Sequence, residues 1–204
     1  MPKRLLPPEG LYPLPPPRPR LWVRWLLGLV EKGMGKPLWA QRVLSHHPKS
    51  LLGAGLMEAL VVHKDREVPR RVLKMVRVYV SARVSCPFCV DLNGKDFDKE
   101  GLSETELEAI LLMARDPGEK LPDSFSASEK AALELAQAAC DTPVGYTWEL
   151  RQRVGQFWSP RAQVVLSATA AQVNFWARLI QAFGTRPAGF SDVCSRDQKI
   201  KEFR

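Results

Sequence analysis

Apolar residues along most of the chain recur at intervals of three and four positions, the spacing that places them on one face of an α-helix. From Leu21 onward this spacing dominates, and no useful run of alternating apolar and polar residues, the pattern of a half-buried strand, is present. Two stretches illustrate it: Trp22, Trp25, Leu26 and Leu29 in the first, and Val72, Met75, Val76 and Tyr79 in the second. The pattern predicts an all-α protein.

Helix boundaries are indicated by proline, glycine and capping residues. Ser103 and Glu106 have the spacing of a capping box, in which each side chain bonds the other residue's backbone amide. Ser126 (or Ser128) with Glu129 is a second candidate cap, and Gly101 is a typical helix stop. We expect helices over 21–30, from Pro37 to about 47, from Ser50 to about 63, from Pro69 onward, and over 86–99, 107–114, 130–140, 147–157 and 160–183.

Both ends of the chain differ from its middle. Residues 1–20 contain eight prolines, and proline disfavours helix, so this segment is expected to be an extended proline-rich arm. Residues 187–204 are polar and are expected to form a peripheral tail. The predicted helical domain therefore covers residues 21–186, and a 204-residue chain is long enough to bury a core without metal or disulfides.

The net charge of +8 raises the question of nucleic acid as a partner. The densest basic group is Arg70, Arg71, Lys74 and Arg77, which has no interleaved stacking aromatics and is interpreted as a solvated helix face. The apolar stretch Leu21–Val30 is too short to span a membrane. We expect no nucleic-acid or membrane partner, no signal peptide, and, with four cysteines, a cytoplasmic protein.

The chemistry centres on Cys86 and Cys89, a C-P-F-C pair within a helical context. Pro87 fits the first turn of a helix, where unpaired backbone amides favour a thiolate, so the pair suits thiol–disulfide or peroxide chemistry. A thioredoxin setting requires strands that are absent from the pattern. Zinc requires two further ligands, for which His46, His47 and His63 are the candidates, and inert burial of both thiols is the third alternative.

The residues around the pair resemble a known family. The stretch V-S-A-R-V-S-C-P-F-C-V-D-L-N-G-K, the G-L-S at 101–103, the H-H-P at 46–48 and the N-F-x-x-R at 174–178 are similar to the alkylhydroperoxidase D and carboxymuconolactone decarboxylase family, over roughly residues 36–186. The resemblance implies an all-helical fold that assembles into homo-oligomers, and we expect no bound organic cofactor and no metal. It also implies that Cys89 is oxidised by hydroperoxide to a sulfenic acid, that Cys86 resolves it, and that an external dithiol or thiol protein restores the pair.

Two positions depart from the family's redox members. Asn93 stands where they carry a histidine and Lys74 where they carry a glutamate, so the usual proton relay is missing. We therefore hypothesise electrostatic activation of the thiol by Lys74, with help from Arg77. Asp91 and Asp96 are interpreted as solvated charges and not as substitute bases.

The remaining candidates have structural interpretations. His46, His47 and His63 lie at predicted helix ends, Cys140 is expected in the core, and Trp148, Trp158 and Trp176 are expected in the core or a subunit interface. The predicted function is a thiol-dependent peroxidase or disulfide oxidoreductase. The alternative is a catalytically degenerate helical oligomer that acts as a redox sensor or binding scaffold.

Overall fold

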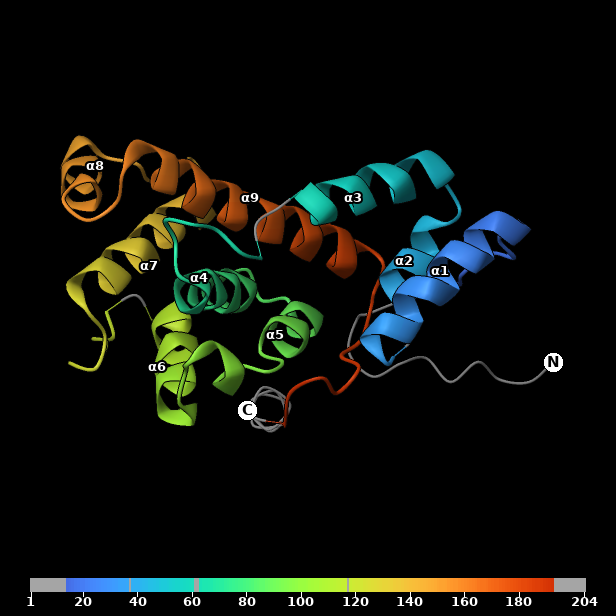
Figure 1. The fold of residues 1–204 in the computed structure, drawn as a ribbon, viewed down its shortest axis with the longest axis horizontal. Coiled ribbons are helices and arrows are strands. Elements are labelled where there is room, and N and C mark those ends of the chain that lie inside the picture. Colours follow the sequence, from blue (N-terminus) through green and yellow to red (C-terminus); the bar gives the residue numbers. More distant parts are fainter. Residues whose placement is uncertain (1–13, 37, 61–62, 117, 193–204) are drawn as a thin grey trace. The chain divides into compact units, whose positions relative to one another are not determined.

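The computed structural model describes residues 14–36, 38–60, 63–116 and 118–192. Within these residues the secondary structure is helical and contains no strand, which confirms the predicted all-α class (Figure 1). The elements are α1 Leu21–Met34, α2 Trp39–Leu44, α3 Pro48–Leu60, α4 Arg70–Arg83, α5 Pro87–Asn93, the 3-10 turn η1 Asp98–Glu100, α6 Glu104–Arg115, α7 Ala127–Cys140, α8 Trp148–Gly155 and α9 Pro160–Ala182.

The chain divides into two compact units: residues 1–60 with 178–186, and residues 61–177 with 187–204. In the first unit, Glu31 accepts hydrogen bonds from the Arg42 side chain at 2.6 and 2.7 Å and from the amide of Leu38, and so joins α1 to α2. Most of the proline-rich arm and all of the chain after residue 192 lie outside the described residues.

The apolar face predicted for α1 is not the face of that helix that is buried. Val23 and Leu27 are buried, whereas Trp22, Trp25 and Leu29 are exposed. The spacing of three and four was correctly read as helical, but it could not distinguish the face that packs inside this chain from an apolar face turned outward.

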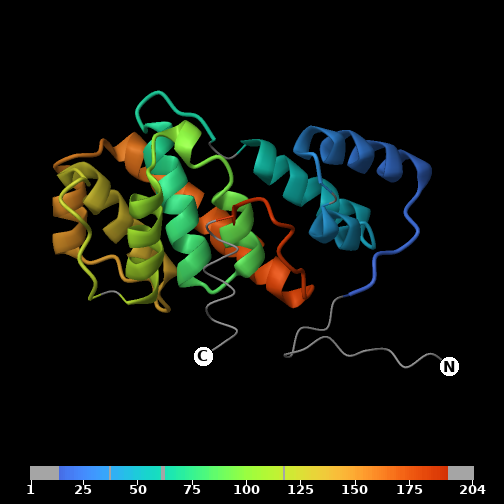
Figure 2. The ribbon, with the colours of Figure 1, turned by 90° about the horizontal axis from the view of Figure 1, so that it is seen from below.

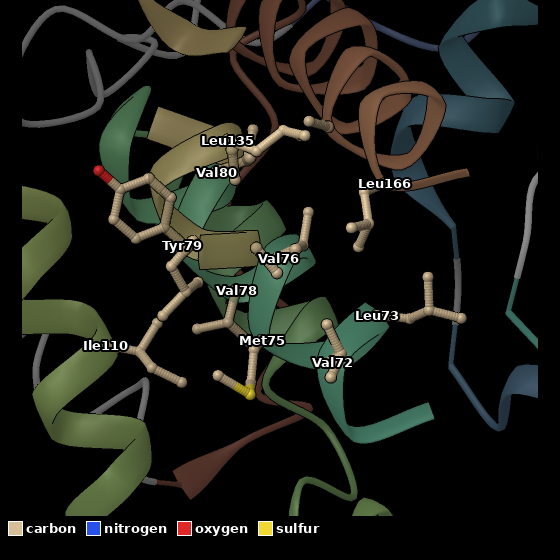
Figure 3. Close-up of a cluster of buried hydrophobic side chains, with 14 of the residues drawn as sticks. Val72, Leu73, Met75, Val76, Val78, Tyr79, Val80, Ile110, Leu135 and Leu166 are labelled. Atoms are coloured by element: carbon tan, nitrogen blue, oxygen red, sulfur yellow. The ribbon is translucent and has the colours of Figure 1, made fainter. Parts of the chain in front are cut away.

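The second unit is built around α4, in which every residue from Val72 to Ala82 except Lys74 is buried. A helix buried along that length lies at the centre of its bundle. The helices α5, α6 and α7 pack directly against it, as two perpendicular views show (Figures 1 and 2). Figure 3 shows its side chains reaching toward Ile110 of α6, Leu135 of α7 and Leu166 of α9.

The caps set where these helices begin. Both predicted capping boxes are present, at Ser103 with Glu106 and at Ser126 with Glu129. The prediction for the cysteine helix was too long, because α5 ends at Asn93 and a separate turn, η1, follows it. Gly101 then stops η1 in the left-handed conformation, at φ 83°.

Candidate functional site

The cysteine pair lies at the start of α5, where the sequence placed it. Cys86 is the N-cap and Pro87 occupies the first turn, so the backbone amide of Cys89 is free to donate to the Cys86 sulfur, at 3.3 Å. On the other side, the amide of Cys86 donates to the carbonyl of Ser81 at 3.0 Å. The first cysteine is therefore held between α4 and the first turn of α5.

The structure joins the two cysteines as a disulfide, with their Cα atoms 5.2 Å apart, within the usual range for such a bond. Cys86 is 0% exposed and Cys89 is 3% exposed. The backbone thus accommodates the oxidised pair, and both sulfurs lie beneath the surface of the chain.

The turn that leads into the pair has an unusual backbone. Ser85, two residues after the end of α4 and directly before Cys86, adopts φ 54°, a left-handed conformation that favours glycine. Its amide donates to the carbonyl of Ala82 at 3.0 Å. This reversal redirects the chain from α4 so that Cys86 can cap α5.

A polar network connects the pair to a buried arginine of α4. Arg77, which is only 7% exposed, donates from Nε to the side-chain oxygen of Asn93 at 3.3 Å. The amide nitrogen of Asn93 donates to the Ser81 hydroxyl at 2.9 Å, and that hydroxyl donates to the carbonyl of Arg77 at 2.6 Å. Ser81 and Asn93 thereby connect the guanidinium to the turn that carries Cys86.

The network continues to His63, whose Nδ1 lies 3.1 Å from Nη1 of Arg77. A guanidinium can only donate, so Nδ1 of His63 must accept, and the imidazole then carries its proton on Nε2. His63 was expected to bond a helix end; instead it binds the buried arginine.

Lys74 does not occupy the position that the electrostatic hypothesis assigned to it. Its ammonium donates to the carbonyl of Lys95 at 2.8 Å, beyond the far end of α5 from the cysteines. A cation there stabilises the negative end of the helix dipole. Of the two residues in that hypothesis, Arg77 is the one connected to the turn of the pair.

Asp91 was predicted to be solvated, and this is wrong. It is completely buried, and its carboxylate accepts backbone hydrogen bonds from Ala188, Gly189 and Ser191, each at 2.8 Å. Three such bonds compensate a buried carboxylate, which leaves it poorly placed to act as a base.

Residues 187–191, which we call the C-terminal strap, therefore lie on α5 and are not peripheral as predicted. The ring of Phe190 contacts that of Phe88, the residue between the cysteines, edge-on with centroids 6.4 Å apart, and the ammonium of Lys95 lies over Phe190. Asp96, in contrast, is exposed and pairs with Lys99 at 2.8 Å. Neither aspartate acts on the sulfurs by contact.

The described residues do not include a set of side chains arranged to bind zinc with the cysteine pair. Nε2 of His46 lies 2.9 Å from the carbonyl of Pro15, and Nδ1 of His47 lies 2.7 Å from the Ser50 hydroxyl. Across the ranges that the structure describes, no three histidine, cysteine or acidic side chains gather as metal ligands would.

The other two cysteines stay apart from this site. Cys140 is half-buried at the end of α7, where the side-chain amide of Asn174 approaches its sulfur at 3.7 Å. Cys194 lies outside the described residues. Of the tryptophans, Trp158 is buried, Trp148 is exposed, and Trp176 contacts Phe175.

Sequence reasoning gave the pair and its cap, but it missed Ser81 and the burial of Arg77. One signal was present: Arg77 interrupts the apolar run M-V-R-V-Y-V, and a charge enclosed by apolar neighbours on a central helix is a candidate for burial. The contact between Asp91 and the strap had no such signal, because its partners lie about a hundred residues away in the sequence.

Comparisons with known proteins agree with this architecture. No family model matches the chain. The uncharacterized protein YdfG of Bacillus subtilis (strain 168) is 32% identical over 126 residues, which are 61% of this chain and 82% of YdfG. Among solved structures, the alkylhydroperoxidase AhpD core of a peroxidase-related protein from Ralstonia eutropha JMP134 has a TM-score of 0.71 at 16% identity, covering 91% of this chain and 95% of that one.

A second solved structure with the same fold is that of a debrominase. The debrominase Bmp8 has a TM-score of 0.70 at 15% identity and covers 91% of this chain and 98% of its own. The fold is therefore the all-α alkylhydroperoxidase D-like fold. By sequence the chain is related to YdfG.

Among the described helices, none is both long and apolar enough to cross a bilayer.

Proposed function

We propose that this protein is a thiol-dependent peroxidase that reduces hydroperoxides with the Cys86–Cys89 dithiol. The observation that supports it most is the placement of both cysteines at the entrance of one short helix, close enough to be joined as a disulfide. Because this backbone already accommodates the disulfide, the pair is suited to a cycle that alternates between dithiol and disulfide.

The oxidative half of the cycle uses the two sulfurs in turn. The thiolate of Cys89 attacks one oxygen of the hydroperoxide, which breaks the O–O bond, forms a sulfenic acid and releases an alkoxide that takes a proton to become the alcohol. Cys86 then attacks the sulfur of Cys89, the S–S bond forms, and hydroxide leaves and is protonated to water. Two thiols and one hydroperoxide give one disulfide, one alcohol and one water.

The reductive half needs a dithiol or a thiol protein. Its thiolate attacks Cys89, and Cys86 is the leaving thiolate, because its sulfur accepts the amide hydrogen of Cys89 at 3.3 Å. The second thiol of the reductant then attacks the mixed disulfide, which restores both protein thiols and leaves the reductant as a disulfide.

The alternative function is a redox sensor or binding scaffold that forms the disulfide without turning over. The burial of both sulfurs favours it, since a buried thiol reacts slowly with reagents in solution. Asn93, which cannot titrate, favours it as well.

One assay separates the two functions: consumption of hydroperoxide with dithiothreitol as the reductant. The wild-type chain should turn over, and Cys89→Ser should consume peroxide no faster than buffer. Cys86→Ser should form the sulfenic acid but no internal disulfide, so that it turns over only as fast as dithiothreitol itself attacks the sulfenic acid. Cys140→Ser is the matched control and should keep the wild-type rate. Wild-type turnover that survives in Cys89→Ser would contradict the peroxidase assignment, and a wild-type disulfide formed without turnover would favour the sensor.

The exposed apolar side chains support a homo-oligomer. Trp25 and Trp148 are each 69% exposed, and Leu21 is 80% exposed. Large exposed apolar side chains often belong to surfaces that contact another protein chain. A reducing compartment such as the cytoplasm would keep the dithiol supplied with electrons. Light scattering of the purified chain tests the oligomer, and a monomeric mass would exclude it.

A further inference from the structure

A buried carboxylate ties the C-terminal strap to α5, the helix that carries the cysteine pair and that we call the redox helix. Asp91 of this helix is completely buried. Its carboxylate accepts hydrogen bonds from three strap amides, those of Ala188, Gly189 and Ser191, each at 2.8 Å. Bonds from amides to a carboxylate are charge-assisted and strong. Because all three bonds end on one side chain, the loss of that carboxylate removes them together.

The strap bends so that its amides converge on this carboxylate. Gly189 adopts φ 73°, a left-handed conformation that glycine takes at no steric cost and other residues rarely take. Successive amides in a bend of this kind form a concave binding site for an anion. The anion that fills the concavity is Asp91, so the backbone of the strap is shaped to fit the redox helix.

A contact between two aromatic rings adds to the hydrogen bonds. The ring of Phe190 lies edge-on against that of Phe88, with centroids 6.4 Å apart, and Phe88 is 1% exposed. Phe88 directly precedes Cys89 in the sequence and lies three positions before Asp91, so Phe88 and Asp91 share one face of α5. The strap therefore covers that face, and it passes α5 in both views of the ribbon (Figures 1 and 2).

The opposite face of the redox helix is held by α4. The amide of Cys86 donates to the carbonyl of Ser81 at 3.0 Å, and the side-chain amide of Asn93 donates to the Ser81 hydroxyl at 2.9 Å. Cys86, Cys89 and Asn93 are spaced by three and four positions, so the cysteines share the face that is turned toward α4. The redox helix thus lies between α4 on one face and the strap on the other.

The two segments that hold α5 differ in how easily they can move. Cys86 and Cys89 are 0% and 3% exposed, so a reagent reaches their sulfurs only after a local movement. The buried helix α4 cannot withdraw without exposing the core. The strap is a short irregular segment, and such segments open locally at low free energy. Since α5 has only seven residues, too few for a helix to be stable by its own hydrogen bonds, release of the strap also loosens α5.

We propose that the strap is a latch that holds the redox helix against α4 and controls access to the cysteine pair. With the strap in place, the sulfurs are protected from solvent. When the strap is released, α5 loses the contacts of Phe88 and Asp91, and the turn that carries the pair opens to a dithiol or a hydroperoxide. The proposal deepens the proposed function and rests on it for its biological use, whereas the latch itself can be measured without turnover.

The test is the rate at which iodoacetamide labels the thiols of the reduced, folded protein, with each labelled cysteine identified by peptide mass. Asp91→Asn keeps the size of the side chain but removes its charge and one acceptor oxygen. Because labelling follows the population of the open form, this variant should speed the labelling of Cys86 and Cys89 about tenfold. Gly189→Ala leaves α5 untouched and strains the bend of the strap, and it should speed the same labelling about fivefold.

Two controls separate the latch from the stability of the whole fold. Asp96→Asn removes an exposed carboxylate that pairs with Lys99 just beyond α5, and it should leave the labelling of the pair unchanged. Cys140, half-buried at the end of α7, is an internal control that should be labelled at one rate in every variant. If Asp91→Asn does not fold, Gly189→Ala carries the test.

Equal labelling of Cys86 and Cys89 in the wild type and in both strap variants would overturn the proposal. An equal acceleration at Cys140 would overturn it as well, because the whole fold would then be loosened. The readout needs no peroxide. Faster labelling in a protein without turnover would therefore remove the peroxidase and keep the latch, whereas turnover with unchanged labelling would do the reverse.

Discussion

Two arginines of α4, Arg71 and Arg77, are six positions apart and serve different parts of the molecule. Arg71 connects α4 to α6 and α7 through the carboxylates of Glu106 and Glu129, at 2.7 and 2.6 Å. Arg77 connects α4 to α5 through the neutral amide of Asn93. One arginine holds the bundle together, and the other faces the redox helix.

The difference follows from the chemistry of the partners. A carboxylate bound to a guanidinium neutralises it locally, so the pair contributes to stability and exerts little field beyond itself. An amide oxygen can accept from a guanidinium but carries no charge of its own. Arg71 therefore joins its helices through ion pairs, whereas the bond from Arg77 to α5 goes to a neutral amide.

The largest expected effect is on the structural side. Arg71→Met should lower the free energy of unfolding by about 3 kcal/mol, because it leaves the mostly buried carboxylates of Glu106 and Glu129 without their common partner. It should leave the titration of the reactive thiol unchanged. Urea unfolding together with the thiol titration measures both, and a thiol that titrates differently in Arg71→Met would show that the two arginines are not separate in function.

A smaller effect should appear in the dependence of stability on pH. Hydrogen bonding to Arg71 holds the pKa of Glu106 at about 2, below its ordinary value of 4.5. Since the folded-state pKa is the lower one, this stabilisation is present above about pH 4.5 and is lost as the pH falls toward 2. The loss should be about 2 kcal/mol after allowance for solvent screening.

Urea midpoints measured across that range of pH check this in the wild type and in Glu106→Gln. The variant should be less stable at neutral pH, and its stability should fall less steeply with acid. An equally steep fall in the variant would assign the acid sensitivity to other carboxylates.

The smallest effect concerns the turn between Arg77 and the pair. Ser85→Gly should stabilise the fold by up to about 1 kcal/mol, because Ser85 has φ 54° and glycine adopts that conformation without steric cost. The thermal midpoint should rise slightly while the pair keeps its titration. A lower midpoint would show that the Ser85 side chain stabilises the turn by more than its backbone costs.

Local signals in the sequence predicted the parts of the fold that depend on near neighbours. The capping boxes that begin at Ser103 and Ser126 each require only a glutamate three residues later. The cap that Cys86 and Pro87 form requires only one turn of helix, so all three could be predicted from a few neighbouring residues. The fold class followed from apolar spacing over the whole chain.

The rest depended on contacts between distant segments. The burial of Arg77 requires knowing that α4 is the central helix, and the burial of Asp91 requires a strap that comes about a hundred residues later. The exposed stripe at Trp22 and Trp25 shows the opposite case, in which a periodic pattern is helical but does not face the core of its own chain. The spacing of apolar residues shows that a helix has an apolar face, but only the folded structure shows whether that face packs against the core.

Whether Cys86 and Cys89 are a working dithiol can be measured from the mass of the reduced protein after brief exposure to hydroperoxide. We expect the loss of two hydrogen atoms per chain, localised to the peptide that contains both cysteines and reversed by dithiothreitol. An unchanged mass in the folded protein, with both thiols alkylated only after unfolding, would contradict it.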